Sequence, residues 1–177
     1  AGAVLPTISS VSLAADNSTI AVTMSEAVYN TNGGSGALEA ADFALSISGG
    51  VATMSSATPT SISASGNVYT LGIGLSGTPN GSETLTVAPV DNGVYDYSGN
   101  EASTTQSNNT ASLNDQLPAT ISSVSLLADN STIAVTMSEA VYSTNGGIGA
   151  IAVSDFVLSI SGGTAAITNS GTPTSIA

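Results

Sequence analysis

Apolar and small polar residues alternate along most of the chain. Ile20, Val22 and Met24 are separated by Ala and Thr, and residues 69–75 read Tyr-Thr-Leu-Gly-Ile-Gly-Leu. A period of two places one set of side chains on the buried face of a half-buried sheet. Helix is expected at most as a turn near residues 37–42. The alternation predicts seven strands in the first part of the chain, at residues 8–13, 19–25, 42–48, 51–55, 67–75, 83–88 and 108–113.

Turn-forming residues separate these predicted strands. Residues 32–34 read Asn-Gly-Gly, residues 79–81 Pro-Asn-Gly and residues 91–93 Asp-Asn-Gly. Gly and Asn adopt positive φ at little cost, and Asp bonds back to its local backbone. About seven short strands with such turns in roughly 110 residues are typical of an immunoglobulin-like sandwich. The sequence therefore predicts an all-β fold of Ig-like β-sandwiches with Greek-key connections.

A long segment from the first part of the sequence occurs a second time further along the chain. Residues 7–52 recur at 120–165, and nine of these 46 positions differ. The spacing of 113 residues exceeds the roughly 20–50 residues of a solenoid or propeller unit and equals a whole small domain. The predicted domains are an N-terminal lead (1–5), a complete repeat (6–113), a linker (114–118) and the N-terminal half of a second repeat (119–177).

The second copy, as given, lacks counterparts of the last three predicted strands. A half sandwich exposes its core face to solvent and has unpaired edge strands. An unpaired edge can pair with another chain. Two interpretations stay open: a continued chain completes the second repeat, or a neighbouring subunit donates the strands. The expected partners are thus neighbouring repeats of the same chain or identical subunits.

The composition excludes several classes of function. Lys, Arg, His, Cys and Trp are all absent, while twelve Asp and Glu residues give a formal charge of −12. Nucleic acids and anionic membrane surfaces are bound mainly through basic side chains, so neither is an expected partner. Without a histidine, thiol or amine, only carboxylate chemistry is left for catalysis. We predict no enzyme, and keep a carbohydrate-binding or carboxylate-based hydrolase module as an alternative.

The sequence favours an exported protein. Ser, Thr, Asn, Gly and Ala dominate and charged residues are sparse, as in bacterial exported surface proteins. No stretch approaches the 18 apolar residues that a membrane-spanning helix needs, so direct membrane insertion is not expected. The start at residues 1–4 (Ala-Gly-Ala-Val) fits either the product of signal-peptide cleavage or an arbitrary boundary. We predict an extracellular location at the cell surface.

Three segments resemble a known family. Residues 16–29 read Asp-Asn-Ser-Thr-Ile-Ala-Val-Thr-Met-Ser-Glu-Ala-Val-Tyr, residues 95–102 Tyr-Asp-Tyr-Ser-Gly-Asn-Glu-Ala, and residues 114–118 Asn-Asp-Gln-Leu-Pro. They resemble the tandem bacterial Ig-like repeats of giant surface adhesins, especially those of cyanobacterial and marine cell-surface proteins linked to swimming or attachment. The resemblance implies a structural role in cell adhesion, as an extracellular rod of stacked sandwiches often stiffened by calcium. The chain departs from the pattern by having no basic residue.

The resemblance places calcium at the junctions between repeats. Calcium binds six to eight oxygen ligands. The candidate ligands are Glu26, Asp96 and Asn100 in the first copy, with Asp115 of the linker facing Glu139 of the second copy. The alternative interpretation is that Glu26 is a solvated turn residue and that Asp96 with Asn100 only shapes a loop.

Tyrosines are the other candidate binding residues. Tyr29, Tyr95 and Tyr97 fall in predicted loops and could stack on a glycan, whereas alternation places Tyr69 in the core. The function expected from the sequence is therefore a structural repeat of an adhesin or surface fibre. The alternative is a subunit of an extracellular filament that polymerises by donor-strand exchange through the incomplete second domain.

Overall fold

The structure, a computed structural model, describes residues 3–177 and divides them into two compact units. Unit 1 ends at Leu117, and unit 2 runs from Pro118 to Ala177. Antiparallel strands build both units, and the helical elements are three short 3₁₀ turns. The prediction of an all-β fold is confirmed.

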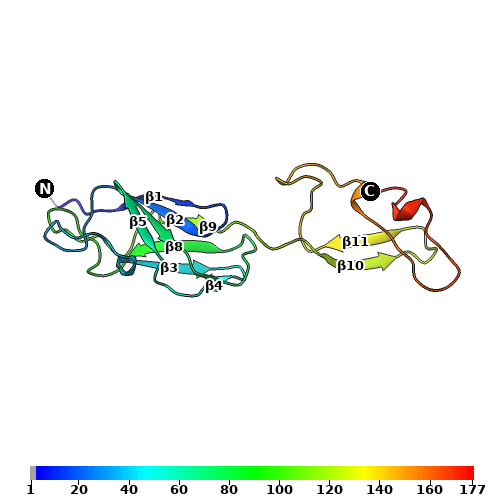
Figure 1. Cartoon of the computed structure of the whole chain (residues 1–177), viewed down its shortest axis with the longest axis horizontal. Coiled ribbons are helices and arrows are strands. Elements are labelled where there is room, and N and C mark those ends of the chain that lie inside the picture. The colour runs from blue at the N-terminus through cyan, green and yellow to red at the C-terminus, as the bar shows by residue number, and fades with distance from the viewer. Residues whose placement is uncertain (1–2) are drawn as a thin grey trace. The chain divides into compact units, whose positions relative to one another are not determined.

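Unit 1 is a sandwich of two main sheets (Figure 1). One sheet has the order β1-β2-β6-β5, the other β3-β8-β9, and a small pair joins β4 to β7. An order of four plus three strands is that of a constant-type immunoglobulin sandwich. The strand bounds are β1 Ile8–Leu13, β2 Thr19–Met24, β3 Phe43–Ser48, β4 Thr53–Met54, β5 Ile62–Ser65, β6 Val68–Gly72, β7 Leu75–Ser76, β8 Thr84–Pro89 and β9 Thr110–Ser112. The 3₁₀ turn η1 (Ala40–Asp42) leads into β3.

The core of unit 1 follows the alternation of the strands. In β2 and β8 every second residue is buried, so each strand presents one apolar face to the other sheet. Tyr69 is buried against Phe43, with 6.2 Å between the ring centroids, as its place in the pattern predicts. The strands contribute these buried hydrophobic residues to the core: Ile8, Ile20, Val22, Met24, Phe43, Leu45, Tyr69, Leu71, Leu85 and Val87.

The predicted strand at residues 67–75 is wrong in its extent. Strand β6 ends at Gly72, and after two residues the chain joins the small β4–β7 pair. A Cβ on Gly72 would lie 2.3 Å from Thr60 Oγ1, and one on Gly74 would lie 2.5 Å from Ser55 Oγ. These two glycines allow the segment between β4 and β5 to pass close by. The apolar alternation continues from β6 into β7, so the sequence pattern does not show that the strand ends at Gly72.

The fourth strand of the β1 sheet is also different from the prediction. The strand expected at residues 51–55 is only the two-residue β4, outside that sheet, while β5 takes the edge position beside β6. Residues 62–65 read Ile-Ser-Ala-Ser, and three of the four are exposed. An edge strand with only one large apolar residue carries little periodic signal, so the sequence pattern did not indicate it.

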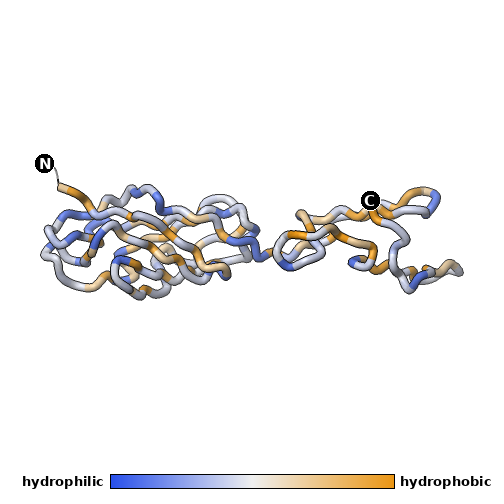
Figure 2. The backbone as a smooth tube through the Cα atoms, turned by 90° about the horizontal axis from the view of Figure 1, so that it is seen from above, coloured by the Kyte–Doolittle hydropathy of each residue, from blue (hydrophilic) through white to orange (hydrophobic). Residues whose placement is uncertain are grey.

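Unit 2 repeats only the first elements of unit 1. Strands β10 (Ile121–Leu126) and β11 (Ile133–Met137) form a hairpin, followed by the 3₁₀ turns η2 (Val153–Asp155) and η3 (Asn169–Gly171). Residues 156–161, which match β3, are not a strand. In unit 1 the strand β3 pairs only with β8, and residues 118–177 hold no copy of β8. Figure 2 shows that apolar positions, in orange, occur along the chain of both units.

Candidate functional site

Most carboxylates of this chain accept hydrogen bonds from backbone N–H groups. Because the chain has no side-chain cation, none of them can form a salt bridge with a Lys, Arg or His. At least eight of the twelve carboxylates instead accept a backbone N–H. The eight carboxylates with such bonds are Asp16, Asp42, Glu83, Asp96, Glu101, Asp115, Asp129 and Asp155.

Asp16 and its copy Asp129 illustrate the local bonds. Each accepts the side-chain hydroxyl of the serine two residues on at 2.6 Å and its backbone N–H, at 3.0 Å and 2.9 Å respectively. These bonds lower the pKa of both aspartates. The two Asx turns form alike although unit 2 lacks the rest of the sandwich, so they depend on neighbouring residues alone.

Glu83 is the one fully buried carboxylate of unit 1. Its Oε1 accepts the N–H of Val51 at 2.8 Å and of Ala52 at 2.9 Å, and both oxygens lie 3.2 Å from the N of Asn80. Burial pushes the pKa of Glu83 up, but the N–H bonds from Ala52, Val51 and Asn80 together outweigh it and lower the pKa to about 2. Glu83 therefore joins two loops as an anion at neutral pH, and the sequence analysis did not single it out.

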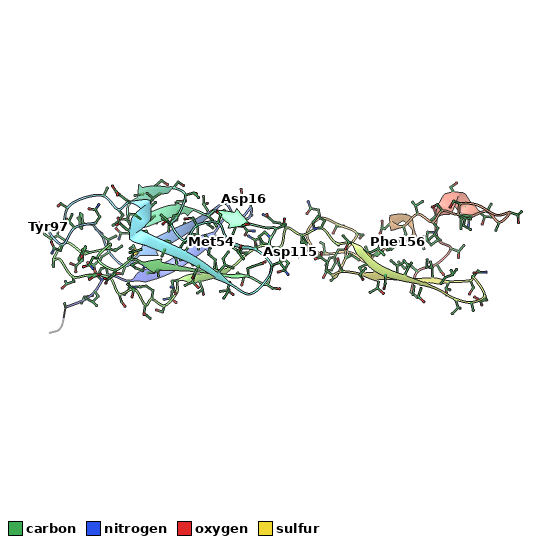
Figure 3. The ribbon with its side chains drawn as sticks, turned by 90° about the horizontal axis from the view of Figure 1, so that it is seen from below. Asp16, Met54, Tyr97, Asp115 and Phe156 are labelled. Carbon is green, nitrogen blue, oxygen red and sulfur yellow. The ribbon has the colours of Figure 1, made fainter. Side chains whose placement is uncertain are left out.

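One end of unit 1 gathers the loops that follow β2 and β8. Tyr29 and Tyr95 exchange two backbone hydrogen bonds of 2.7 and 2.8 Å, which hold the two loops together. Tyr97 is exposed and its ring meets that of Tyr29 edge-on, with centroids 6.3 Å apart. Figure 3 shows Tyr97 at this end and Asp115 at the opposite end of the unit. The tyrosines thus form a small aromatic patch, and glycan binding there stays a prediction.

Asp96 and Asn100 lie together at the same end. Asp96 Oδ1 accepts the backbone N–H of Asn100 at 2.8 Å, and Oδ2 accepts its side-chain Nδ2 at 2.7 Å. The side-chain bond, ahead of the backbone bonds, lowers the pKa of Asp96 against the opposing effect of burial. Both oxygens therefore accept hydrogen bonds within this loop, and metal binding by Asp96 and Asn100 stays a prediction.

The remaining candidate ligands are spread over the two units. Glu26 follows β2 and is partly buried, Asp115 accepts the N–H of Leu117 at 2.9 Å, and Glu139 belongs to unit 2. Among residues 3–177, no three acidic side chains come together in a group that could hold a metal ion. The predicted junction site combines residues of successive repeats, and it stays a prediction.

A buried asparagine closes the other end of unit 1. Asn17 is 1% exposed; its Nδ2 donates to the carbonyl of Asn114 at 2.8 Å, and its Oδ1 accepts the N–H of Asn114 at 2.9 Å. This clamp ties the β1–β2 turn to the segment that leaves β9. Asn17 adopts φ 59°, a conformation that Asn tolerates. The Asp-Asn turn was visible in the sequence, but its distant partner was not.

Unit 2 carries a hollow of about 450 Å³. It lies between β11 and the segment that matches β3, and is lined in part by Val135, Phe156 and Leu158. In unit 1 the matching Val22, Phe43 and Leu45 are at most 2% exposed. Figure 3 labels Phe156, which lies beside the strands of unit 2. The hollow is the core face of a sandwich without its covering strands.

Comparisons with known proteins add little to this picture. No family model matches the chain, and no curated protein matches it. Among solved structures it is similar to the N-terminal part of the bacterial S-layer protein SbsC, with 22% sequence identity and a TM-score of 0.46. The match covers 75% of this chain and 31% of that one, and a likeness this slight supports no inference. No helix within residues 3–177 is long and apolar enough to cross a membrane.

Proposed function

We propose that this chain is a structural segment of an extracellular surface protein, built from tandem copies of a 113-residue sandwich. The observation that carries the proposal is that the copies repeat the backbone as well as the residues. Strands β1–β2 and β10–β11 share the same register, and each pair has its irregularity at the same place, Ile8/Ser10 and Ile121/Ser123. In each repeat, the first hairpin thus forms from residues of that repeat alone, as a modular array requires.

The way the acidic residues are used supports a structural role rather than a catalytic one. Eight of the twelve carboxylates accept backbone N–H groups and thereby hold turns and loops in place. A general acid or base needs a carboxyl group that is free to exchange its proton with a substrate near the working pH. Glu83, with a pKa of about 2, is buried and charged at any ordinary pH. We propose that it stabilises the fold.

Single-molecule stretching tests the array. A chain of three complete copies of residues 6–117 should unfold in three separate events with equal gains in length, since each copy carries its own core. One copy on its own is the control and should give one event of the same size. Three copies that unfold in one event, or in events of unequal length, contradict the proposal.

Antibody labelling tests the location. Antibodies raised against unit 1 should label intact, unpermeabilised cells that make the protein. Labelling that requires permeabilisation would contradict a surface location while leaving the array itself untouched.

A further inference from the structure

Three Asn-Gly pairs lie in turns of unit 1, at residues 32–33, 80–81 and 92–93. In such a pair the backbone nitrogen of the glycine can attack the side-chain carbon of the asparagine, because glycine has no side chain that shields the nitrogen. The attack requires that the side chain and the glycine N–H are free to take up the reacting geometry. The three pairs differ in this freedom.

The pair at residues 92–93 is held at every reacting group. The side-chain Nδ2 of Asn92 donates to Asp91 Oδ2 at 2.8 Å, and its Oδ1 accepts the hydroxyl of Tyr95 at 3.2 Å. The N–H of Gly93 donates to the carbonyl of Val90 at 3.0 Å, and Gly93 is buried. The nitrogen that would attack is therefore already engaged in a hydrogen bond.

The pair at residues 80–81 is held by its own turn. Asn80 Oδ1 accepts the N–H of Ser82 at 3.1 Å, which fixes the side chain in an Asx turn. The backbone N–H of Asn80 lies 3.2 Å from both carboxylate oxygens of the buried Glu83. Reaction at Asn80 thus requires that the bond to Ser82 breaks and that the loop around Glu83 moves.

The pair at residues 32–33 is free at the reacting groups. Asn32 and Gly33 are both exposed, and within residues 3–177 no hydrogen bond engages the side chain of Asn32 or the N–H of Gly33. A Cβ on Gly33 would meet no atom within 4 Å, so there is room for a ring between the two residues. Asn32 is the asparagine of unit 1 that the fold leaves ready to react.

We propose that Asn32 is a site of spontaneous deamidation, whereas Asn80 and Asn92 are protected by the fold. A bond forms between Gly33 N and Asn32 Cγ, the bond from Cγ to Nδ2 breaks, and ammonia leaves with the amide proton of Gly33. Water then opens the cyclic imide at one of its two carbonyls, which gives aspartate or isoaspartate at position 32. This modification is separate from the structural role proposed above and does not depend on it.

The position of Asn32 gives the modification a structural effect. A Cβ on Gly34 would lie 2.7 Å from Tyr97 Cδ2, and one on Gly99 would overlap the carbonyl oxygen of Asn32. The loop is therefore packed closely against the loop that carries Tyr97. Isoaspartate adds a carbon atom to the backbone and a negative charge, so its formation should displace Tyr97 from its contact with Tyr29.

The experiment is an incubation of the folded 177-residue chain at mildly alkaline pH, followed by denaturation and cleavage after glutamate. Mass spectrometry then follows the conversion of each side-chain amide to a carboxyl group. We expect Asn32 to react at least about tenfold faster than Asn80 or Asn92, since reaction at those two requires hydrogen bonds to break. The three pairs fall in separate peptides, namely residues 27–39, 40–83 and 84–101.

Two controls separate the effect of the fold from that of the sequence. In denaturant the three pairs should react at similar rates, because each then consists of an asparagine followed by glycine in an open chain. Gly33→Ala should slow the reaction of Asn32 severalfold by shielding the nitrogen. Since Gly33 has open space around it and no positive φ, this variant should melt like the unaltered chain.

Three outcomes would overturn the proposal. They are equal rates at Asn32 and Asn92 in the folded chain, a rate at Asn32 that Gly33→Ala leaves unchanged, and an Asn32 that stays intact while the denatured chain reacts.

The effect on the tyrosine patch is measured by NMR on the aged chain. The cross-peaks between the rings of Tyr29 and Tyr97 should weaken as isoaspartate accumulates, and the chain with Gly33→Ala should keep them. If the cross-peaks persist in chains that contain isoaspartate, the predicted displacement of Tyr97 is wrong. Failure here is distinguishable from failure of the array, because three-copy unfolding does not depend on the state of Asn32.

Discussion

The same sequence occurs twice in this chain, once inside a complete sandwich and once without its covering strands. Turns and hairpin are alike in both: β1–β2 and β10–β11 have one register, and Asn17 and Asn130 one backbone conformation. Burial differs completely, since β1 and β2 have buried residues and β10 and β11 have none. The comparison separates what neighbouring residues decide from what distant strands decide.

Truncating matched isoleucines is expected to give the largest contrast. Ile20→Ala should destabilise unit 1 by about 2–5 kcal/mol, because the side chain is fully buried and its removal leaves a cavity. Ile133→Ala in unit 2 should leave the melting of unit 1 within about 0.5 kcal/mol of the unaltered chain. Thermal unfolding of both variants measures the difference. If the two variants destabilise unit 1 equally, the stability of unit 1 depends on unit 2.

The predicted calcium junction is expected to give the next largest effect. In a chain of two complete repeats, calcium at a hundred times its dissociation constant should stabilise the fold by about 2.7 kcal/mol. Chelator should reverse this, and Asp115→Asn in the linker should reduce it. A single repeat is the control and should not respond, since no three acidic side chains come together among its described residues. If calcium does not change the melting temperature of the two-repeat chain, the prediction of a junction site is wrong.

Removing the charge of Glu83 should cost about 1–3 kcal/mol, because Glu83→Gln keeps the size but loses an anion that accepts buried N–H groups. The difference should depend on pH. Glu83 has a folded pKa of about 2 against the ordinary 4.5, so its stabilisation is complete above pH 4.5 and is lost as pH falls towards 2.

Melting temperature measured from pH 7 down to pH 2 tests the role of Glu83. The unaltered chain should lose its advantage over Glu83→Gln across the lower part of that range. A gap between the two proteins that stays constant with pH would contradict the assignment. Unit 2 has no counterpart of Glu83, so the melting of unit 1 is the quantity to follow.

The asparagine clamp is expected to give the smallest effect. Asn17→Gly keeps the positive φ and removes three hydrogen bonds with Asn114, and should destabilise unit 1 by about 1–2 kcal/mol. Asn130→Gly is the matched variant on an exposed turn and should leave unit 1 unchanged. Chemical denaturation of both proteins measures the contrast. If the two variants lower the stability of unit 1 equally, the bonds to Asn114 are not the cause.

Much of the sandwich could be predicted from alternation alone. The ends of β1 agree with the prediction to the residue, and those of β2 and β3 within one residue. Two features could not be predicted in this way. Strand β5 lies at an edge and is mostly polar, so it shows little alternation. The change of sheet after Gly72 is marked only by glycines, which have no side chain to show a pattern. The candidate ligands Asp96 and Asn100 do lie together, but they bind one another.

The sequence by itself determined the strands, the turns and the repeat, because these depend on side-chain alternation and on bonds between residues a few positions apart. Asp42 and Asp155 show this, since each accepts the N–H of the residue three before it, whether that residue is Glu39 or Ala152. Only the tertiary structure decided which apolar face is a core and which is a surface. Burial requires strands from far along the chain, and β6 and β8 reach the first copy but not the second.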